Sequence, residues 1–288
     1  MRRIFSLIRT YIALCKINIS LLSVFSAAAG FVVSTLQMKA QIIPVVTGVF
    51  VLACGSCALN QYQDRNIDAL MSRTCRRPIP SGRIKPDSAL IFSILLILSG
   101  FILLSFTASQ LAIGLGMLAV LWYNGLYTFL KRRSAFAVIP GAFIGAVPFA
   151  IGWVSGGSDI SDIRLLLVCF FFFMWQVPHF WLLMAVHGDE YREAGIPSLT
   201  GIFTDAQLMR IIFIWILSTS VSAVLISAYG IIQSSFINTF LISLSLLMTL
   251  YGIKLLNGKT VSTNALFGGI NIYICIVLFI FFIDVLLL

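Results

Sequence analysis

The sequence predicts an all-α protein that crosses a membrane nine times. Its 288 residues are 60% hydrophobic and only 10% charged, with a mean hydropathy of +1.04. The apolar residues form long runs, and a run of about 18 suffices for a helix to cross a membrane core of about 30 Å. A closed β-barrel is the other architecture that spans a membrane, but it needs alternating strands of about ten residues, which this sequence lacks.

Nine runs meet this length, and no soluble domain is evident between them, so residues 1–288 are predicted to form a single membrane domain. In chain order the runs are Ile17–Leu36, Ile42–Tyr62, Ser88–Phe106, Gln110–Leu130, Ala135–Val154, Ile163–Val186, Leu208–Gly230, Ile232–Leu256 and Ala265–Leu288.

The basic residues predict the orientation of the chain. When the N-terminus is placed in the cytoplasm, 17 of the 19 lysines and arginines fall on the inner side, and only Lys39 and Arg164 fall outside. Cytoplasmic loops of membrane proteins carry such an excess. We therefore expect the N-terminus inside and the C-terminus outside. This placement accounts for the net charge of +9, so we expect no nucleic-acid partner.

Three oxygen-bearing side chains stand at intervals of four residues where the second span meets the first long inner connection, Asn60, Asp64 and Asp68. If the second helix continues through them, they share one face and stand about 6 Å apart along the axis. Such a row at the end of a membrane span is costly unless a cation pairs with it. Mg²⁺ prefers oxygen ligands and is often held by one or two carboxylates together with substrate phosphates.

Arginines follow directly, among them Arg73, Arg76, Arg77 and Arg83. Guanidinium groups clamp phosphate oxygens through paired hydrogen bonds, so acids that hold a metal beside these bases predict a diphosphate site. The alternative is a solvated loop whose arginines only set the topology and whose acids pair with them. Spacing alone leaves both interpretations open.

Two further inner segments carry charge. Tyr127 and Lys131 are four residues apart and can both reach a phosphate, although they also fit a plain cytoplasmic anchor. After the sixth span, Asp189, Glu190 and Glu193 form a second acidic cluster. Two acidic clusters at one membrane face would let two metal ions flank one diphosphate.

These motifs together resemble a known family. Asn60-x-x-x-Asp64-x-x-x-Asp68, Arg73-Thr74, the segment 77–82 (Arg-Pro-Ile-Pro-Ser-Gly) and Tyr127-x-x-x-Lys131 are similar to signatures of the intramembrane (UbiA-type) prenyltransferase superfamily. More selective segments are Asn60-Gln61-Tyr62, Pro178-His179-Phe180-Trp181, the segment 141–148 with Gly152-Trp153, and the segment 190–197 (Glu-Tyr-Arg-Glu-Ala-Gly-Ile-Pro). They resemble the protohaem IX farnesyltransferase (haem O synthase) family from about Lys16 to the last span.

The resemblance implies a nine-helix enzyme of a bacterial cytoplasmic (inner) membrane that uses Mg²⁺. It would transfer the farnesyl group of farnesyl diphosphate to a vinyl group of haem B, and the haem O formed would imply a link to terminal-oxidase assembly. It assigns the metal to Asn60, Asp64 and Asp68, with Asp189 and Glu190 as a second acidic site. Catalysis is assigned to Asp64, Asp68, Lys131 and Glu190. Substrate binding is assigned to Asn60, Arg73, Arg77, Tyr127, Lys131, Arg132, His179, Trp181 and Tyr191. The family usually has Asp at position 190 and a basic residue at position 188, which is Gly188 here.

His179 is one of two histidines in the chain. Because a histidine is a common axial ligand of haem iron, we expect His179 to contact the iron or position the porphyrin; the alternative is a hydrogen-bonded core residue. His187 is the second candidate. Aromatic side chains would shield and stabilise an allylic cation, or would only pack in the core or face lipid. The candidates are Trp122, Tyr123, Trp175, Phe180 and Trp181.

Two other functions fit parts of the sequence. An aromatic polyprenyltransferase acting on a quinone-precursor ring would share the diphosphate site but not the His-Phe-Trp segment. A secondary transporter would also carry intramembrane charges and helices interrupted by Gly and Pro. The acids here cluster at one membrane face and not at the midplane, which disfavours transport.

Overall fold

The computed structural model describes residues 2–254, 256 and 263–288. Lys259, one of the basic residues assigned to the inner side, lies outside the described residues. Within the described part every regular element is a helix, and nine helices are long and apolar enough to cross a membrane. The predicted class, an all-α protein with nine membrane-spanning helices, is confirmed.

The spans correspond to elements in chain order. They are α2 (Ile17–Thr35), α3 (Ile42–Asp68), α4 (Pro86–Ser105), the run α5–η1–α6 (Gln110–Leu130), the run η2–α7–η3–α8 (Ala135–Ser155), α9 (Ile163–Val186), α11 (Asp205–Ala228), α12 (Ser235–Ile253) and α13 (Thr263–Leu286). Two elements lie outside the spans, α1 (Arg2–Leu14) and α10 (Gly188–Glu193).

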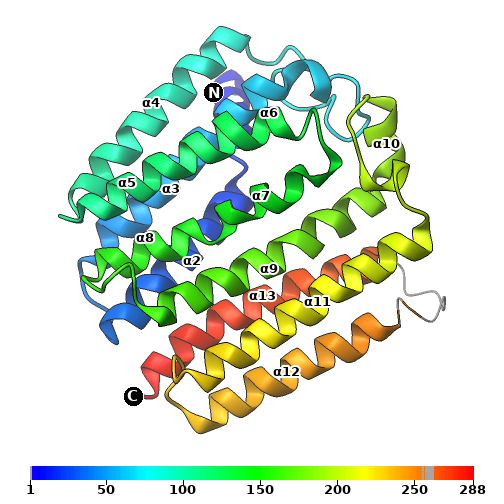
Figure 1. The fold of residues 1–288 in the computed structure, drawn as a ribbon. Helices are drawn as coiled ribbons and strands as arrows, with labels where there is room; N and C mark the ends of the chain where they lie inside the picture. Colours follow the sequence, from blue (N-terminus) through cyan, green and yellow to red (C-terminus); the bar gives the residue numbers. More distant parts are fainter. Residues whose placement is uncertain (1, 255, 257–262) are drawn as a thin grey trace.

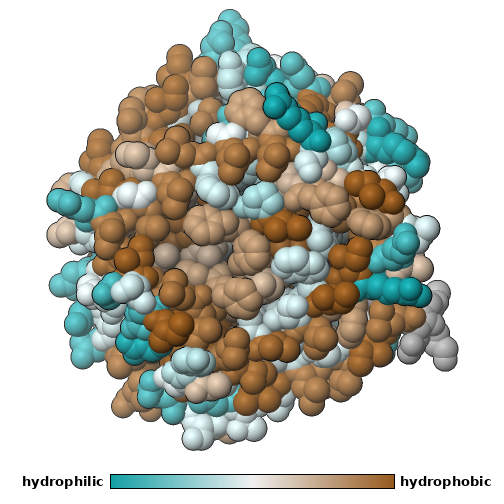
Figure 2. Space-filling model, viewed as in Figure 1, coloured by the Kyte–Doolittle hydropathy of each residue, from teal (hydrophilic) through white to brown (hydrophobic). Residues whose placement is uncertain are grey.

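Figure 1 shows the helices side by side in one bundle. α3 packs along α4, α2 along α8, and α9 along α11, and α13 contacts both α2 and α9. The connection after α3 and the short helix α10 meet at one end of the bundle, and the C-terminus lies at the other. Apolar side chains cover most of the face seen in Figure 2, while hydrophilic ones gather towards its edges. Two segments rich in ionisable residues, far apart in sequence, are thus brought to one end.

α3 is longer than the hydropathy of its sequence predicts. The apolar run ends near Tyr62, but the helix continues through Asp68. The last turns stay helical because their acidic side chains are paired with basic groups of other segments, as described below. Asn60, Asp64 and Asp68 therefore do share one face, and all three are buried.

The fourth and fifth spans are not regular α-helices. A π-helix, η1 (Leu121–Tyr127), interrupts the fourth. The fifth consists of the 3₁₀ turns η2 (Ala135–Ala137) and η3 (Phe143–Gly145) and the helices α7 (Val138–Ala142) and α8 (Val147–Ser155). Prolines at 140 and 148 lack the backbone donor that a regular helix needs. π-helical and 3₁₀ segments of this kind are frequent at functional sites, and both line the cavity described next.

A separate helix, α1, precedes the first span. It ends at Leu14, and Lys16 then takes a left-handed conformation with a φ of 45°. A non-glycine residue in this region is strained unless its surroundings hold it. Gln61 of α3 does so nearby, because its amide donates to the carbonyls of Ala13 and Leu14 at 3.1 and 2.9 Å.

Candidate active site

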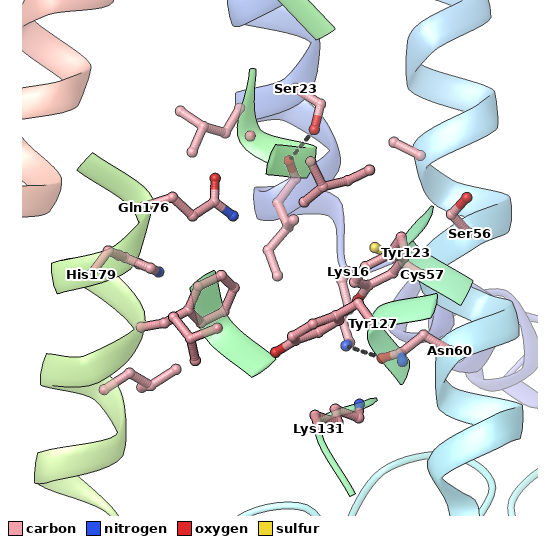
Figure 3. A pocket seen from close by; sticks show the side chains of 18 of the residues that line it. Lys16, Ser23, Ser56, Cys57, Asn60, Tyr123, Tyr127, Lys131, Gln176 and His179 are labelled. Atoms are coloured by element: carbon pink, nitrogen blue, oxygen red, sulfur yellow. Dashed lines mark hydrogen bonds between the residues drawn. The ribbon is translucent and has the colours of Figure 1, made fainter. Parts of the chain in front are cut away.

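A cavity of about 530 Å³ runs into the bundle from the end where the charged segments meet. α2, α3, η1, the broken fifth span and α9 line most of it, and α13 closes the deep end. Charged side chains line its mouth, and apolar ones such as Leu22, Val49, Phe172 and Leu278 line its depth. Figure 3 shows Lys16, Asn60, Tyr127 and Lys131 grouped on one side and Gln176 and His179 facing them from α9.

Asn60, Asp64 and Asp68 form one wall of the mouth. Their relative exposures are 3, 5 and 4%, yet all three line the cavity. The Asn60 amide donates to Thr128 Oγ1 at 3.1 Å, which leaves its Oδ1 for a cation. The two carboxylates of this row are buried, and buried carboxylates are stable only when cationic groups pair with them.

The basic partners come from two other segments. Arg77 donates to both carboxylate oxygens of Asp68 at 2.7 Å. Lys131 forms an ion pair with Asp64 Oδ2, and Arg132 reaches Asp64 Oδ1 at 3.2 Å. Among the arginines that follow α3, Arg77 therefore does pair with an acid, as the alternative interpretation expects, but Arg77 and Lys131 also line the cavity. The diphosphate site stays a prediction.

Lys16 is a further cation that sequence reasoning did not assign to the site. Its Nζ approaches Asn60 Oδ1 at 3.5 Å (Figure 3). Desolvation by burial is the main cause that lowers the pKa of Lys16 to about 8, and the neighbouring charges of Arg77 and Lys131 act in the same direction. A single lysine just ahead of an apolar run reads as an ordinary topology signal, so the sequence offered no means of separating it from the other basic residues.

The mouth carries an excess of positive charge. The cavity is lined by four basic side chains, Lys16, Arg73, Arg77 and Lys131, and by two acidic ones, Asp64 and Asp68. Two positive charges therefore have no acidic partner in the lining. A site with this balance favours a multiply charged anion.

The π-helix brings two tyrosines to the same wall. Tyr123 and Tyr127 stack with ring centroids 6.0 Å apart, and Lys131 Nζ lies 5.6 Å from the Tyr127 ring. Asn124, between them, donates to the Ser56 carbonyl at 3.0 Å and so fixes η1 against α3. Tyr127 and Lys131 thus both face the cavity, as their spacing predicts.

The two acidic side chains at the start of the second acidic segment have different partners. Glu190 accepts from the backbone N–H of Arg73 at 3.1 Å, and this bond lowers the pKa of the Glu190 carboxyl. Asp189 instead pairs with Arg192 at 2.7 Å, with 86% of its side chain exposed. Tyr191 is half-buried and lines the cavity, and desolvation raises its pKa. The segment thus contributes Tyr191 to the cavity, while Glu190 supports the arginine loop.

The residues at the mouth fit Mg²⁺. Two carboxylates and an amide oxygen from α3 are hard oxygen donors of the kind that Mg²⁺ takes alongside phosphates and water. Within the described ranges, no group of three or more His, Cys, Asp or Glu side chains forms a complete metal cage. The donor set therefore suits an ion that shares its coordination with a phosphate ligand.

The predicted aromatic residues are distributed between cavity and core. Tyr123, Trp175 and Phe180 line the cavity. Trp122 donates to the Pro140 carbonyl at 2.7 Å. Trp181 is 2% exposed and packs edge-on against Trp215 in the core. His179 lines the cavity and bonds to Asn271, while His187 lies 3.8 Å from Glu190.

The chain is similar in sequence to proteins of known family. The model of the UbiA prenyltransferase family matches residues 19–283. A protoheme IX farnesyltransferase of Geobacter sulfurreducens is 36% identical over 226 residues, which cover 77% of this chain and 82% of that protein. One of Bdellovibrio bacteriovorus is 39% identical over 199 residues, covering 67% and 68%.

Solved structures share the fold. A digeranylgeranylglyceryl phosphate synthase superposes with a TM-score of 0.80 at 17% identity, over 98% of this chain and 99% of that one. A UbiA homolog from Archaeoglobus fulgidus bound to GPP and Mg²⁺ gives a TM-score of 0.73 at 17% identity, over 96% and 99%.

Proposed function

The chain belongs to the UbiA prenyltransferase family, and we propose that it converts haem B to haem O with farnesyl diphosphate as the prenyl donor. The observation that carries the proposal is one cavity in which a positively charged mouth leads into an apolar depth. A prenyl diphosphate has the matching shape, with an anionic head and an apolar tail. The relatives named protoheme IX farnesyltransferase support haem as the acceptor.

The mouth would bind the diphosphate. Arg73, Arg77, Lys131 and Lys16 would donate hydrogen bonds to its oxygens, and Tyr127 would add a hydroxyl. Asn60, Asp64 and Asp68 would hold Mg²⁺, which neutralises the charge that builds on a leaving diphosphate. A solved relative of the same fold holds GPP and Mg²⁺, which supports this assignment. Glu190 would fix the Arg73 backbone, and Arg132 would orient Asp64.

The reaction follows from this placement. As the allylic C–O bond breaks, its electron pair leaves with diphosphate, and the cationic groups of the mouth stabilise the developing negative charge. The π electrons of a haem vinyl group form the new C–C bond to the allylic carbon. Water then adds to the remaining vinyl carbon and loses a proton, which gives the hydroxyethylfarnesyl tail. Tyr123, Trp175 and Phe180 present aromatic faces in the cavity that would stabilise the allylic cation.

The farnesyl chain would lie among the apolar residues of the cavity, where each buried CH₂ contributes about 0.8 kcal/mol. His179 would face the haem. We place the protein in a bacterial inner membrane with the mouth towards the cytoplasm, because the segments that form the mouth hold most of the basic residues. Its product would then serve terminal-oxidase assembly.

Haem analysis of membranes tests the proposal. Membranes from cells with and without this protein are extracted, and their haems are separated and weighed by mass spectrometry. We expect a farnesylated haem only where the protein is present. If haem B is unchanged in both, the proposal fails.

A quinone-ring acceptor is the alternative within the same family. Purified protein is offered haem B or 4-hydroxybenzoate in parallel, each with farnesyl diphosphate and Mg²⁺. We expect diphosphate release coupled to product only with haem B. Prenylation of 4-hydroxybenzoate alone would assign the chain to the alternative.

A further inference from the structure

We propose that Asn271, on α13, is a positioning residue that holds His179 in the tautomer whose free Nε2 ligates the iron of the haem substrate. The inference rests on the proposed function and deepens it. It concerns how the porphyrin is held, which the diphosphate site does not determine.

The hydrogen bonds around Asn271 define the tautomer. His179 Nδ1 lies 2.8 Å from Asn271 Oδ1, and Asn271 Nδ2 donates to the Phe267 carbonyl at 2.7 Å. Because a carbonyl only accepts, the amide must place its nitrogen towards Phe267 and its oxygen towards the histidine. The proton of His179 therefore sits on Nδ1, and Nε2 keeps its lone pair.

The neutral form is the one that this environment supports. Among the described ion pairs none involves His179, so no carboxylate offsets the charge of an imidazolium. The ring lies in a membrane-spanning helix beside aromatic side chains, where an unpaired charge is costly. A neutral imidazole with a free nitrogen is the form that ligates iron.

The ring is held in place from several sides. Trp175 and Phe267 lie against it with centroids at 4.9 and 5.2 Å and tilts of 33° and 36°, and Phe180 meets it edge-on at 5.3 Å. Trp175, one turn earlier on α9, donates to the Ile270 carbonyl of α13 at 2.9 Å. Two successive turns of α9 are thus tied to neighbouring positions of α13, so the imidazole is oriented before any ligand arrives.

The free nitrogen has access to the cavity. His179 is among the residues that line it, and Figure 3 shows the side chain extending from α9 into the pocket, across from Tyr127 and Lys131. Within the described part of the chain, Nδ1 is the ring nitrogen that forms a hydrogen bond. Histidines that bind metals typically donate their other ring N–H to a carbonyl or carboxylate, which fixes the ring and raises the basicity of the ligand. The Asn271 amide carbonyl has this relation to His179.

Iron ligation by His179 would anchor the porphyrin on the α9 side, while the diphosphate is held across the cavity by α3 and Lys131. A vinyl group and the allylic carbon would then meet between two fixed points. A porphyrin without a metal lacks the axial bond. We therefore expect the enzyme to discriminate haem B from protoporphyrin IX by KM, and this discrimination to depend on His179 and Asn271.

The test uses the full chain in lipid nanodiscs with haem B. Resonance Raman spectra of the ferrous form report the iron–histidine stretch, and absorption titrations give the Kd. We expect the stretch in the wild type, its loss in His179→Ala, and its return in His179→Gly with added imidazole. Asn271→Leu is expected to shift the stretch and weaken haem binding on the order of 10- to 100-fold. Asn271→Asp keeps an acceptor oxygen, and because a carboxylate is the stronger acceptor it should retain the stretch and shift it in the direction opposite to Asn271→Leu.

Ser245→Ala is the matched control. It removes another buried hydrogen bond to α13, between the hydroxyls of Ser245 and Tyr273 at 2.9 Å, and should leave the spectrum and Kd unchanged. Asn271→Leu should leave the KM for protoporphyrin IX unchanged, because this porphyrin has no iron for His179 to bind. A general loss of packing would instead raise the KM for both porphyrins.

An unchanged stretch and Kd in His179→Ala would overturn iron ligation, and an unchanged stretch and Kd in Asn271→Leu would overturn the positioning role. Either result can occur in a protein that makes haem O. The haem analysis of membranes tests the proposed function separately, so failure of this inference can be told apart from failure of the proposed function.

Discussion

Asp64 is the residue on which two cations of the mouth converge. Lys131 and Arg132 both pair with its carboxylate, and the residue is 5% exposed. Removing the acid of a buried ion pair leaves its basic partners buried without a counter-charge. The resulting loss of stability exceeds what any one of the ion pairs contributes. In the proposed enzyme Asp64 would also bind Mg²⁺, so its negative charge would stabilise both the basic side chains and the metal.

We expect Asp64→Asn to reduce kcat for diphosphate release on the order of 10²- to 10³-fold, the usual cost of losing one group that stabilises developing charge. Release of inorganic diphosphate from farnesyl diphosphate and haem B measures the effect. Asp162→Asn, at the exposed pair with Arg164, is the control and should retain wild-type turnover. Wild-type rates in Asp64→Asn would remove this residue from the catalytic site.

Lys16 makes the proposed reaction sensitive to alkaline pH. Its pKa is lowered to about 8 by desolvation in the cavity, so the ammonium group loses its proton as the pH rises through that value. The free enzyme then has one cation fewer to bind diphosphate. We expect kcat/KM for farnesyl diphosphate, which reports the free enzyme, to fall above about pH 8.

Lys16→Arg separates this effect from titration of the substrate. Because a guanidinium stays charged throughout the range, the alkaline decline should move to higher pH in this variant, while Lys16→Met should lower kcat/KM at neutral pH as well. An identical decline in wild type and Lys16→Arg would show that Lys16 is not its source.

At the scale of elements, the sequence predicts the spans well and their interruptions poorly. Hydropathy locates nine runs because the membrane imposes one length on every crossing helix. It does not detect the π-helix around Asn124, since a π-helix differs from an α-helix only in the backbone hydrogen-bond partner. It also ends α3 at Tyr62, because the charges of Asp64 and Asp68 are read without their distant partners Lys131 and Arg77.

Some residues of the candidate site can likewise be predicted from the sequence, and others cannot. The row Asn60, Asp64 and Asp68 is predictable because four-residue spacing puts side chains on one face whatever surrounds the helix. The placement of Lys16 and Asn271 is not, since each depends on contacts between segments far apart in sequence. The burial of Trp181, which packs on Trp215, has the same cause. Asp189 differs, because its partner Arg192 is only three residues away, and the four-residue spacing rule gives no preference between this local pair and a place in the cavity.

α12 begins with a cap supplied by another helix. Asp284 of α13 is 2% exposed and accepts from the backbone N–H groups of Gln233 and Ser234 at 2.9 and 2.8 Å. A carboxylate at a helix N-terminus satisfies donors that have no partner within the helix and is also favoured by the helix dipole. This bond pair joins the last two helices at the end opposite the mouth.

We expect Asp284→Leu to lower the free energy of unfolding by about 1–3 kcal/mol for each amide left without a partner, and Asp284→Asn to lower it less because one acceptor oxygen remains. Thermal unfolding in detergent measures the change in Tm. Asp205→Asn, an exposed acid in the first turn of α11, serves as the control and should leave the Tm nearly unchanged. An equally small effect in Asp284→Leu would show that these amides find other partners.

For the whole molecule, the cavity's mouth and the membrane orientation are linked. The connections that form the mouth, after α3, α6 and α9, hold Arg73, Arg77, Lys131 and Arg192. The basic residues that set the topology are therefore partly the residues proposed to bind diphosphate. One orientation satisfies both the membrane insertion rule and access of a soluble diphosphate product to the cytoplasm.

This link gives a prediction for the chain ends. If the nine apolar helices of the described residues all cross the membrane and the mouth faces the cytoplasm, we expect the N-terminus inside and the C-terminus, after α13, outside. We expect a C-terminal alkaline phosphatase fusion, which folds only on the outer side, to be active, and a fusion truncated after α12 to be inactive. A fluorescent protein that matures only in the cytoplasm should give the reverse pattern.

An odd number of spans puts the two ends of the chain on opposite sides of the membrane. If the mouth faces the cytoplasm, the full-length phosphatase fusion must therefore be active. An inactive fusion of a chain that still makes haem O would place the C-terminus inside and require either eight crossings or the opposite orientation.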